Sequence, residues 1–224
     1  MQSSIVTAIA VAGAVLTLGV ASAAVHAETT LGAPRTSAGV PDLSAMLPAP
    51  APVPMRTVTV YVGKDLDGDG QPDIADPTGN APRGEDAYGE GCFHAPRDGG
   101  GRTHEGVDYV AKAGQAVVAP ISGYVTHIGL AYPGDQTLKY VEIENPALKL
   151  TARVFYVDPD VAMGDAVEVG RAIGRAHTLQ RRYRHGITDH IHLELVDRRG
   201  RKLDAEKLIL AQNATVPATT AMGD

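Results

Sequence analysis

The run from Asp189 to Val196 reads Asp-His-Ile-His-Leu-Glu-Leu-Val and limits what this chain can fold into more than any other stretch. Its alternation of polar and apolar residues predicts a β-strand with one face on a hydrophobic core. Because successive side chains of a strand point to opposite faces, His190, His192 and Glu194 share one side. The two imidazoles therefore converge on one space, which indicates a metal or catalytic site.

A second run, from Thr103 to Tyr109, offers matching groups. On an extended backbone His104, Gly106 and Asp108 also point to one side, and the glycine between them is expected to leave a gap for an ion. Two histidines and one carboxylate, with a fourth position open to water, are the ligand composition of a catalytic zinc site. The hypothesis is that the two runs meet around one divalent cation.

The composition gives no support to a nucleic-acid-binding protein and rules out a disulfide framework. A net charge of −6 gives no reason to expect a nucleic-acid partner. The single cysteine, Cys92, cannot form an internal disulfide, so the fold must depend on its core and on metals.

The N-terminal segment predicts export. Residues from Ile5 to Val25 form an uncharged apolar run that ends in a small-x-small cleavage pattern at Ala27, so residues 1–27 are expected to be a signal peptide. The run is also long enough to remain uncleaved as a membrane anchor. Either alternative places the protein in the periplasm, in the cell envelope or outside the cell.

Residues 28–56 are rich in proline and alanine and predict a disordered linker.

Residues 57–89 combine a strand with an acidic loop. Thr57–Val62 alternates like a strand, and the loop that follows has the spacing of a calcium-binding loop, with Gly70 at the turn position. Pro77 removes the exiting helix of a paired calcium sensor. The alternative interpretation is a solvated acidic linker. The candidate calcium ligands are Asp65, Asp67, Asp69, Asp73 and Asp76.

Residues 90–211 are expected to form one mainly β domain with antiparallel sheets, followed by a flexible tail at 212–224. Short alternating runs separated by turn residues predict the strands, and the segment from Asp204 to Leu210 is the one expected helix. The predicted strands cover residues 117–120, 123–128, 140–144, 152–157 and a hairpin within 166–174.

Four motifs in this order resemble those of the lysostaphin-type (LytM-like) zinc metallopeptidases over most of residues 90–210. They are His104-x-x-x-Asp108, Ala119-Pro120-x-x-Gly123-x-Val125, Gly164-Asp165-x-Val167-x-x-Gly170-x-x-Ile173-Gly174 and His190-x-His192-Leu193-Glu194. The resemblance implies an antiparallel β-sheet fold with a groove, one zinc ion, and hydrolysis of peptide bonds in bacterial peptidoglycan. It also implies that His104, Asp108 and His192 are the zinc ligands and that His190 assists catalysis.

One position departs from the family pattern. Asp158 stands where these enzymes usually carry another histidine, two residues after Tyr156. Strand alternation would place Tyr156 and Asp158 on one face, as a hydroxyl donor and a base, while His177 or His185 could supply the missing imidazole. Local similarity extends to the leukocyte cell-derived chemotaxin branch, which keeps the zinc ligands, lacks the same histidine and is regarded as a non-peptidase. The runs that carry it are Ala95-Pro96-Arg97, His104-Glu105-Gly106-Val107-Asp108 and Val154-Phe155-Tyr156.

Three functions follow as alternatives. The first is a monomeric zinc endopeptidase, in which water bound to the metal attacks a cell-wall peptide. The second is a zinc-stabilised binding or regulatory module with little or no hydrolysis, which the aspartate at 158 favours. The third is an iron oxygenase with two histidines and one carboxylate, although such enzymes more usually show His-x-Asp spacing.

Overall fold

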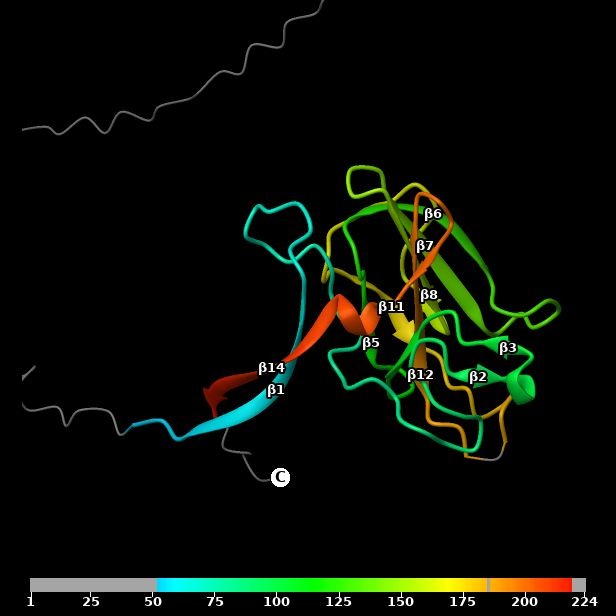
Figure 1. Cartoon of the computed structure of the whole chain (residues 1–224), viewed down its shortest axis with the longest axis horizontal. Coiled ribbons are helices and arrows are strands. Elements are labelled where there is room, and N and C mark those ends of the chain that lie inside the picture. Colours follow the sequence, from blue (N-terminus) through cyan, green and yellow to red (C-terminus); the bar gives the residue numbers. More distant parts are fainter. Residues whose placement is uncertain (1–51, 185, 219–224) are drawn as a thin grey trace, which may run out of the picture. The chain divides into compact units, whose positions relative to one another are not determined.

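The computed structural model describes residues 52–184 and 186–218. The predicted signal peptide or anchor at 1–27, most of the linker and His185 lie outside the described residues. Figure 1 shows that strands are the main regular elements of the described chain, with almost no helix. The strands are β1 Met55–Gly63, β2 Pro96–Arg97, β3 Arg102–Thr103, β4 Val107–Val110, β5 Ala116–Val118, β6 Gly123–Leu130, β7 Lys139–Asn145, β8 Leu150–Phe155, β9 Val157–Pro159, β10 Ala166–Val167, β11 Ala172–Ala176, β12 His190–Asp197, β13 Lys202–Leu203 and β14 Ile209–Pro217.

The largest sheet has the strand order β10-β6-β7-β8-β12-β13, and β4 also pairs with β12. All of its pairings are antiparallel, which confirms the mainly β, antiparallel fold class. β8 shows why this sequence forms a strand, because its residues alternate between buried and half-buried along the whole element. Ala152 and Val154 are the fully buried residues at its centre.

A three-stranded sheet with the order β5-β11-β9 shares the core of the largest sheet. Val117 and Ile173 enter the core from the smaller sheet, and Ile143, Ile191 and Leu193 enter it from the larger one, all with no exposed surface. Burying five such side chains contributes about 1.5–3 kcal/mol each. This shared core holds β12 in place, and β12 carries the first motif. No helix in the described part of the chain is long and apolar enough to cross a membrane.

The C-terminal region differs from the sequence expectation. The helix expected from Asp204 to Leu210 is wrong: the structure has a single 3-10 turn, η3 Ala205–Lys207, whose N-cap is Asp204. β14 follows and pairs with β1, from Met55 opposite Pro217 to Gly63 opposite Ile209, so residues 212–217 continue a strand where a tail was expected. A helix of two turns is marginal in water, and pairing with a distant strand satisfies the same backbone groups.

Candidate metal centre

The two runs singled out in the sequence lie side by side. β12 lies between β8 and β4, and its antiparallel register with β4 places His192 opposite Asp108. His104 lies in the turn before β4, and its ring is 4.7 Å from the ring of His192, measured between centroids. The structure therefore brings together His104, Asp108 and His192, whose side chains can together hold a metal ion.

Three ligand atoms form a small triangle within this group. The Nε2 atom of His104 lies 2.9 Å from Nδ1 of His192 and 3.1 Å from Oδ1 of Asp108, and that oxygen lies 2.8 Å from Nδ1 of His192. In a tetrahedral zinc site with bonds of 2.0–2.1 Å, neighbouring ligand atoms are about 3.3 Å apart. The three atoms are thus slightly closer than zinc ligands, and a small relaxation would fit them to the ion.

Each of the two imidazoles has a hydrogen-bond partner outside the triangle, which allows its other nitrogen to act as a metal ligand. Nδ1 of His104 donates to the carbonyl oxygen of Cys92 at 2.8 Å, which leaves a lone pair on Nε2. Nε2 of His192 faces the carboxylate of Glu194 at 3.6 Å, which favours a hydrogen there and a lone pair on Nδ1. When these protonation states are adopted, two nitrogen lone pairs and a carboxylate oxygen converge, and this donor set fits a divalent cation that displaces the protons otherwise shared with Asp108.

The charges around the triangle favour the same conclusion. Burial raises the pKa of Asp108, but hydrogen bonds from His104 and His192 outweigh it and hold the pKa well below its usual range. Burial lowers the pKa of His192, yet its hydrogen bonds to Asp108 and Glu194 raise the pKa to about 9. A positive charge is therefore favourable at this point, whether a proton or a metal ion supplies it.

His190 lies beside the triangle without belonging to it. Its Nδ1 donates to the carbonyl oxygen of Thr188 at 2.7 Å, and its Nε2 lies 3.5 Å from Oδ1 of Asp108. Burial is the main cause that lowers the pKa of His190, so its imidazole is neutral at pH 7. A neutral imidazole with its lone pair toward the site can accept a proton from water.

Tyr156 and Asp158 do not share a face, contrary to the expectation from strand alternation. Tyr156 has a left-handed backbone with φ of 68°, and it separates β8 from β9. Its ring packs edge-on against His190, with 5.4 Å between the ring centroids. The carboxylate of Asp158 is 55% exposed and accepts a hydrogen bond from Nδ1 of His177 at 2.9 Å. Neither Asp158 nor His177 lines the cavity at the metal centre, so the structure gives neither one a place in its chemistry.

Gly106 has a different role from the one expected. A Cβ atom at this position would lie 2.4 Å from the carbonyl oxygen of Leu193 and 2.7 Å from Cε1 of His192. The space that the glycine leaves is thus filled by β12 and by the His192 ring. Gly106 therefore permits the close approach of the two motifs.

A cavity of about 510 Å³ opens over the metal centre, and Tyr132 and Tyr183, which the sequence did not indicate, line it together with the expected Tyr156. The Tyr132 hydroxyl lies 2.6 Å from that of Tyr156 and 2.7 Å from that of Tyr183. The Arg182 guanidinium stacks over the ring of Tyr132, with 3.9 Å from Cζ to the centroid. These tyrosines come from separate loops and strand ends, so no local pattern could have grouped them.

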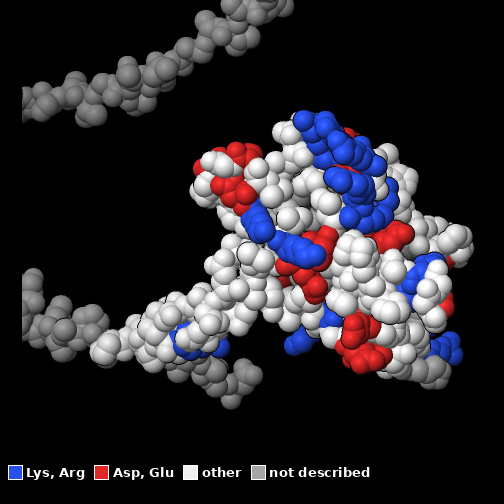
Figure 2. Space-filling model, in the orientation of Figure 1, with Lys and Arg blue, Asp and Glu red and all other residues white. Residues whose placement is uncertain are grey.

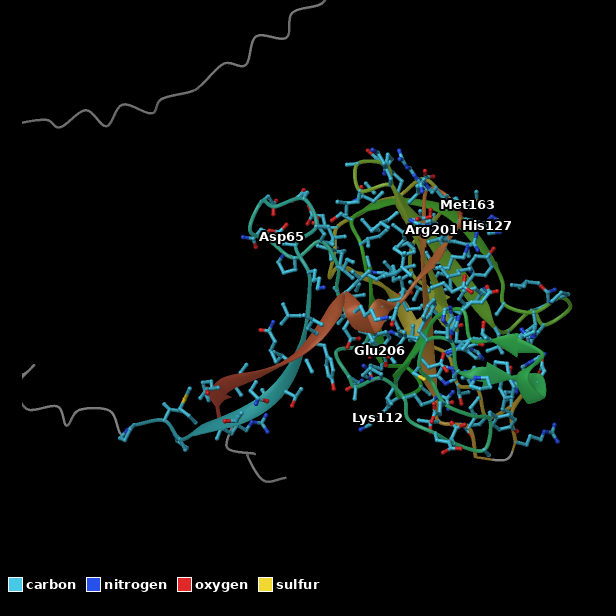
Figure 3. The ribbon with its side chains drawn as sticks, in the orientation of Figure 1. Asp65, Lys112, His127, Met163, Arg201 and Glu206 are labelled. Atoms are coloured by element: carbon cyan, nitrogen blue, oxygen red, sulfur yellow. The ribbon has the colours of Figure 1, made fainter. Side chains whose placement is uncertain are left out.

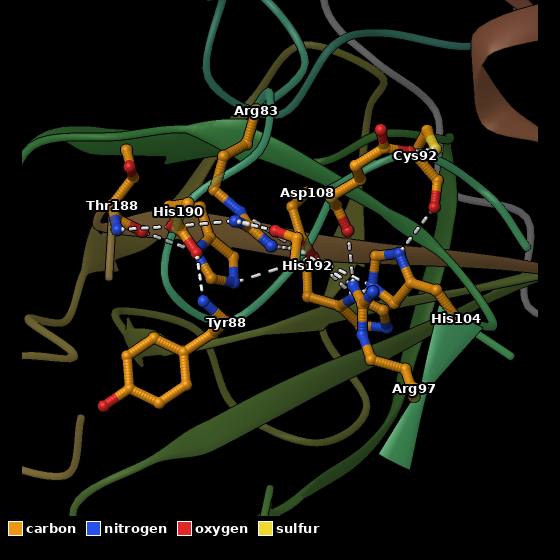
Figure 4. A network of polar contacts seen from close by, with 12 residues as sticks. Arg83, Tyr88, Cys92, Arg97, His104, Asp108, Thr188, His190 and His192 are labelled. Atoms are coloured by element: carbon orange, nitrogen blue, oxygen red, sulfur yellow. Dashed lines mark hydrogen bonds and ion pairs between the residues drawn. The ribbon is translucent and has the colours of Figure 1, made fainter. Parts of the chain in front are cut away.

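Arg83 and Asp86 are the other residues that the sequence did not reveal. The guanidinium of Arg83 is buried, lies 2.8 Å from Oδ2 of Asp108 and donates a hydrogen bond to it (Figure 4). It also lies 2.7 Å from Oδ2 of Asp86. A lone arginine in a polar segment gives no sequence signal for such a role.

The acidic loop is partly assembled as a cation site. Asp65, Asp67 and Asp73 offer carboxylate oxygens within 4.8 Å of one another, and Figures 2 and 3 show this acidic loop on the surface. Asp69 and Asp76 do not join the group, and buried Asp76 accepts hydrogen bonds from the backbone of Thr78 and Gly79 instead. The Asp65 carboxylate already accepts backbone N–H groups of the loop, which explains the turn without an ion. Calcium binding stays a prediction.

Comparison with known proteins decides the family. The model of "Peptidase family M23" matches residues 102–205. Leukocyte cell-derived chemotaxin-2 of Mus musculus is 30% identical over 117 residues, which are 50% of this chain and 71% of the relative. The chain belongs to peptidase family M23. The resemblance drawn from the sequence motifs, including the chemotaxin branch, is thereby confirmed.

Three further proteins match over a smaller share of their own length or with a low TM-score. Myeloid protein 1 of Gallus gallus is 34% identical over 121 residues, which are 53% of this chain, and the chain spans 36% of that relative. The lysostaphin catalytic domain from Staphylococcus simulans is 21% identical with a TM-score of 0.41, over 53% of this chain and 88% of that one. A zinc-containing peptidase from Vibrio cholerae is 25% identical with a TM-score of 0.42, over 58% of this chain and 37% of that one.

Proposed function

We propose that this M23 domain is a zinc-dependent endopeptidase that hydrolyses peptide bonds of bacterial peptidoglycan. The observation that carries the proposal is the convergence of two imidazole nitrogens and one carboxylate oxygen, with a neutral His190 beside them. His104, Asp108 and His192 would hold the ion. Zinc bound there would lower the pKa of a water molecule to about 7 and polarise a carbonyl group.

Two further steps, proton acceptance and stabilisation of the substrate oxygen, are assigned to residues around the metal centre. Nε2 of His190 accepts the proton of the attacking water, because its Nδ1 hydrogen is engaged by Thr188. The hydroxyls of Tyr132, Tyr156 and Tyr183 carry three hydrogens but form two hydrogen bonds with one another, which leaves one hydrogen for a substrate oxygen. Burial raises the pKa of Tyr156 well above its usual value, so its hydroxyl stays protonated. The remaining hydroxyl hydrogen of these tyrosines would stabilise the substrate oxygen, which is the role of the histidine usually found at position 158 in this family.

Digestion of purified peptidoglycan tests the proposal. Wild-type protein should release peptide fragments that disappear with a chelator and return with zinc. His190→Ala should release about a hundred- to ten-thousandfold less product while it still binds zinc, because general bases typically contribute a factor of this size. His127→Ala is the matched control, because His127 is exposed on β6 and does not line the cavity.

A second candidate function is a zinc-binding module without hydrolysis. The orientation of Asp158 toward His177 favours it, because position 158 contributes nothing to the cavity. Stoichiometric zinc binding together with no chelator-sensitive product from wild-type protein would select this candidate. Absence of bound zinc would reject both.

A further inference from the structure

We infer that Arg83 is a positioning residue that aligns two functional groups at once, the metal-binding Asp108 and the proton-accepting His190. The inference rests on the proposed zinc site. It concerns a segment, residues 81–89, that precedes the part of the chain matched by the family model.

The first contact of Arg83 is with Asp108. Both side chains are nearly inaccessible to solvent, with 3% and 4% of their surface exposed. Nη2 of Arg83 donates to Oδ2 of Asp108 at 2.8 Å, and Nε lies 3.3 Å from the same oxygen. The backbone N–H of Arg83 also donates to the Asp108 carbonyl oxygen at 2.6 Å. Oδ2 is therefore occupied, and Oδ1 is the oxygen left for the metal triangle.

The second contact of Arg83 is with Asp86. Nη1 of Arg83 lies 2.7 Å from Oδ2 of Asp86, and that oxygen accepts the backbone N–H of Thr188 at 2.8 Å. The carbonyl oxygen of Thr188 in turn accepts Nδ1–H of His190. One guanidinium thus connects Asp108 with the segment that sets the tautomer and ring orientation of His190 (Figure 4).

The charge and shape of arginine suit this position. Asp86 and Asp108 are two carboxylates in a poorly solvated region, and the cation between them reduces their repulsion. A planar guanidinium donates in several fixed directions, whereas the ammonium of lysine is a compact point charge. Arg97 cannot substitute, because its Nη2 is 3.8 Å from Asp108 and donates to the carbonyl oxygen of Glu90.

Zinc affinity of the full chain, measured by competition with a chelating dye, tests the first contact. Arg83→Ala should weaken zinc binding about 10- to 100-fold, and Arg83→Lys should recover part of the loss. Arg201→Lys is the control, since Arg201 pairs with Asp197 and does not line the cavity. A purely structural role would lower the melting temperature of Arg83→Lys and leave the zinc affinity of its folded fraction unchanged.

Asp86→Asn tests the second contact. This variant also keeps the inference testable if Arg83→Ala does not fold. The Nδ1–H signal of His190 in NMR spectra should exchange faster with water in this variant, while zinc affinity falls less than in Arg83→Ala. Equal zinc affinity of wild type and both Arg83 variants, or an unchanged His190 signal in Asp86→Asn, overturns the inference and leaves the proposed function intact. A wild-type chain that binds no zinc overturns the proposed function and the inference together.

Discussion

Gly106→Ala is the substitution that most directly tests how the two motifs come together. The added Cβ would lie 2.4 Å from the carbonyl oxygen of Leu193, where ordinary contact begins at 3.4 Å. It would also lie 2.7 Å from Cε1 and 2.9 Å from Nε2 of His192. β4 and β12 must therefore separate by about 1 Å, or the His192 ring must turn away from the triangle.

The expected magnitude follows from this displacement. Overpacking of a buried position costs about 1–3 kcal/mol of unfolding free energy. Metal–ligand distances hold to within about 0.2 Å, so a shift of His192 by about 1 Å should weaken zinc binding at least tenfold. Denaturant unfolding measures the stability, and competition with a chelating dye measures the affinity. Gly101→Ala is the matched control, because its nearest neighbour would be the Asp98 carbonyl oxygen at an ordinary 3.5 Å.

Two results would contradict this reasoning. Unchanged stability of Gly106→Ala would show that β4 and β12 are not packed as closely as described. Reduced stability with unchanged zinc affinity would show that the position of His192 does not govern metal binding.

Three further predictions use other parts of the molecule. Zinc at about 100 times its dissociation constant should raise the unfolding free energy by about 2.7 kcal/mol, and His104→Ala should lose this gain in thermal melts. Glu142→Gln should destabilise the protein at pH 7 by about 0.5–1 kcal/mol. Burial raises the pKa of Glu142, but hydrogen bonds from Arg153 and Thr126 outweigh it and lower the pKa. The carboxylate therefore stabilises the fold above its unfolded pKa of about 4.3, and denaturation curves of the two proteins should converge as the pH falls below that value. Tyr132→Phe should cost about 0.5–1.5 kcal/mol in denaturant unfolding, because it removes the common hydrogen-bond partner of two part-buried hydroxyls, whereas exposed Tyr124→Phe should cost nothing measurable.

The predictable part of the site is the part that depends on strand geometry. Alternation along β12 was enough to group His190 and His192, because the hydrophobic core fixes which face is buried. His104 reaches Asp108 from the turn before β4, which strand alternation does not describe. Arg83 joined the site through contacts between segments far apart in the sequence, with no periodic pattern to mark it. The 3-10 turn and β14 were missed for the same reason, since the pairing partner of β14 lies near residue 60.

The break at Tyr156 leads to a last prediction, on Asp158→His. A histidine at this position would fill the place that is usual in the lysostaphin-type pattern, and strand alternation alone would predict a large gain in peptidase activity. The left-handed backbone of Tyr156 directs position 158 toward His177 instead, outside the cavity. Asp158→His should therefore change the release of peptidoglycan fragments less than twofold, whether the wild-type protein is active or not. A gain of tenfold or more would mean that the chain between β8 and β9 can turn position 158 toward the metal centre, and the tyrosine hydroxyls would then no longer be needed to explain stabilisation of the substrate oxygen.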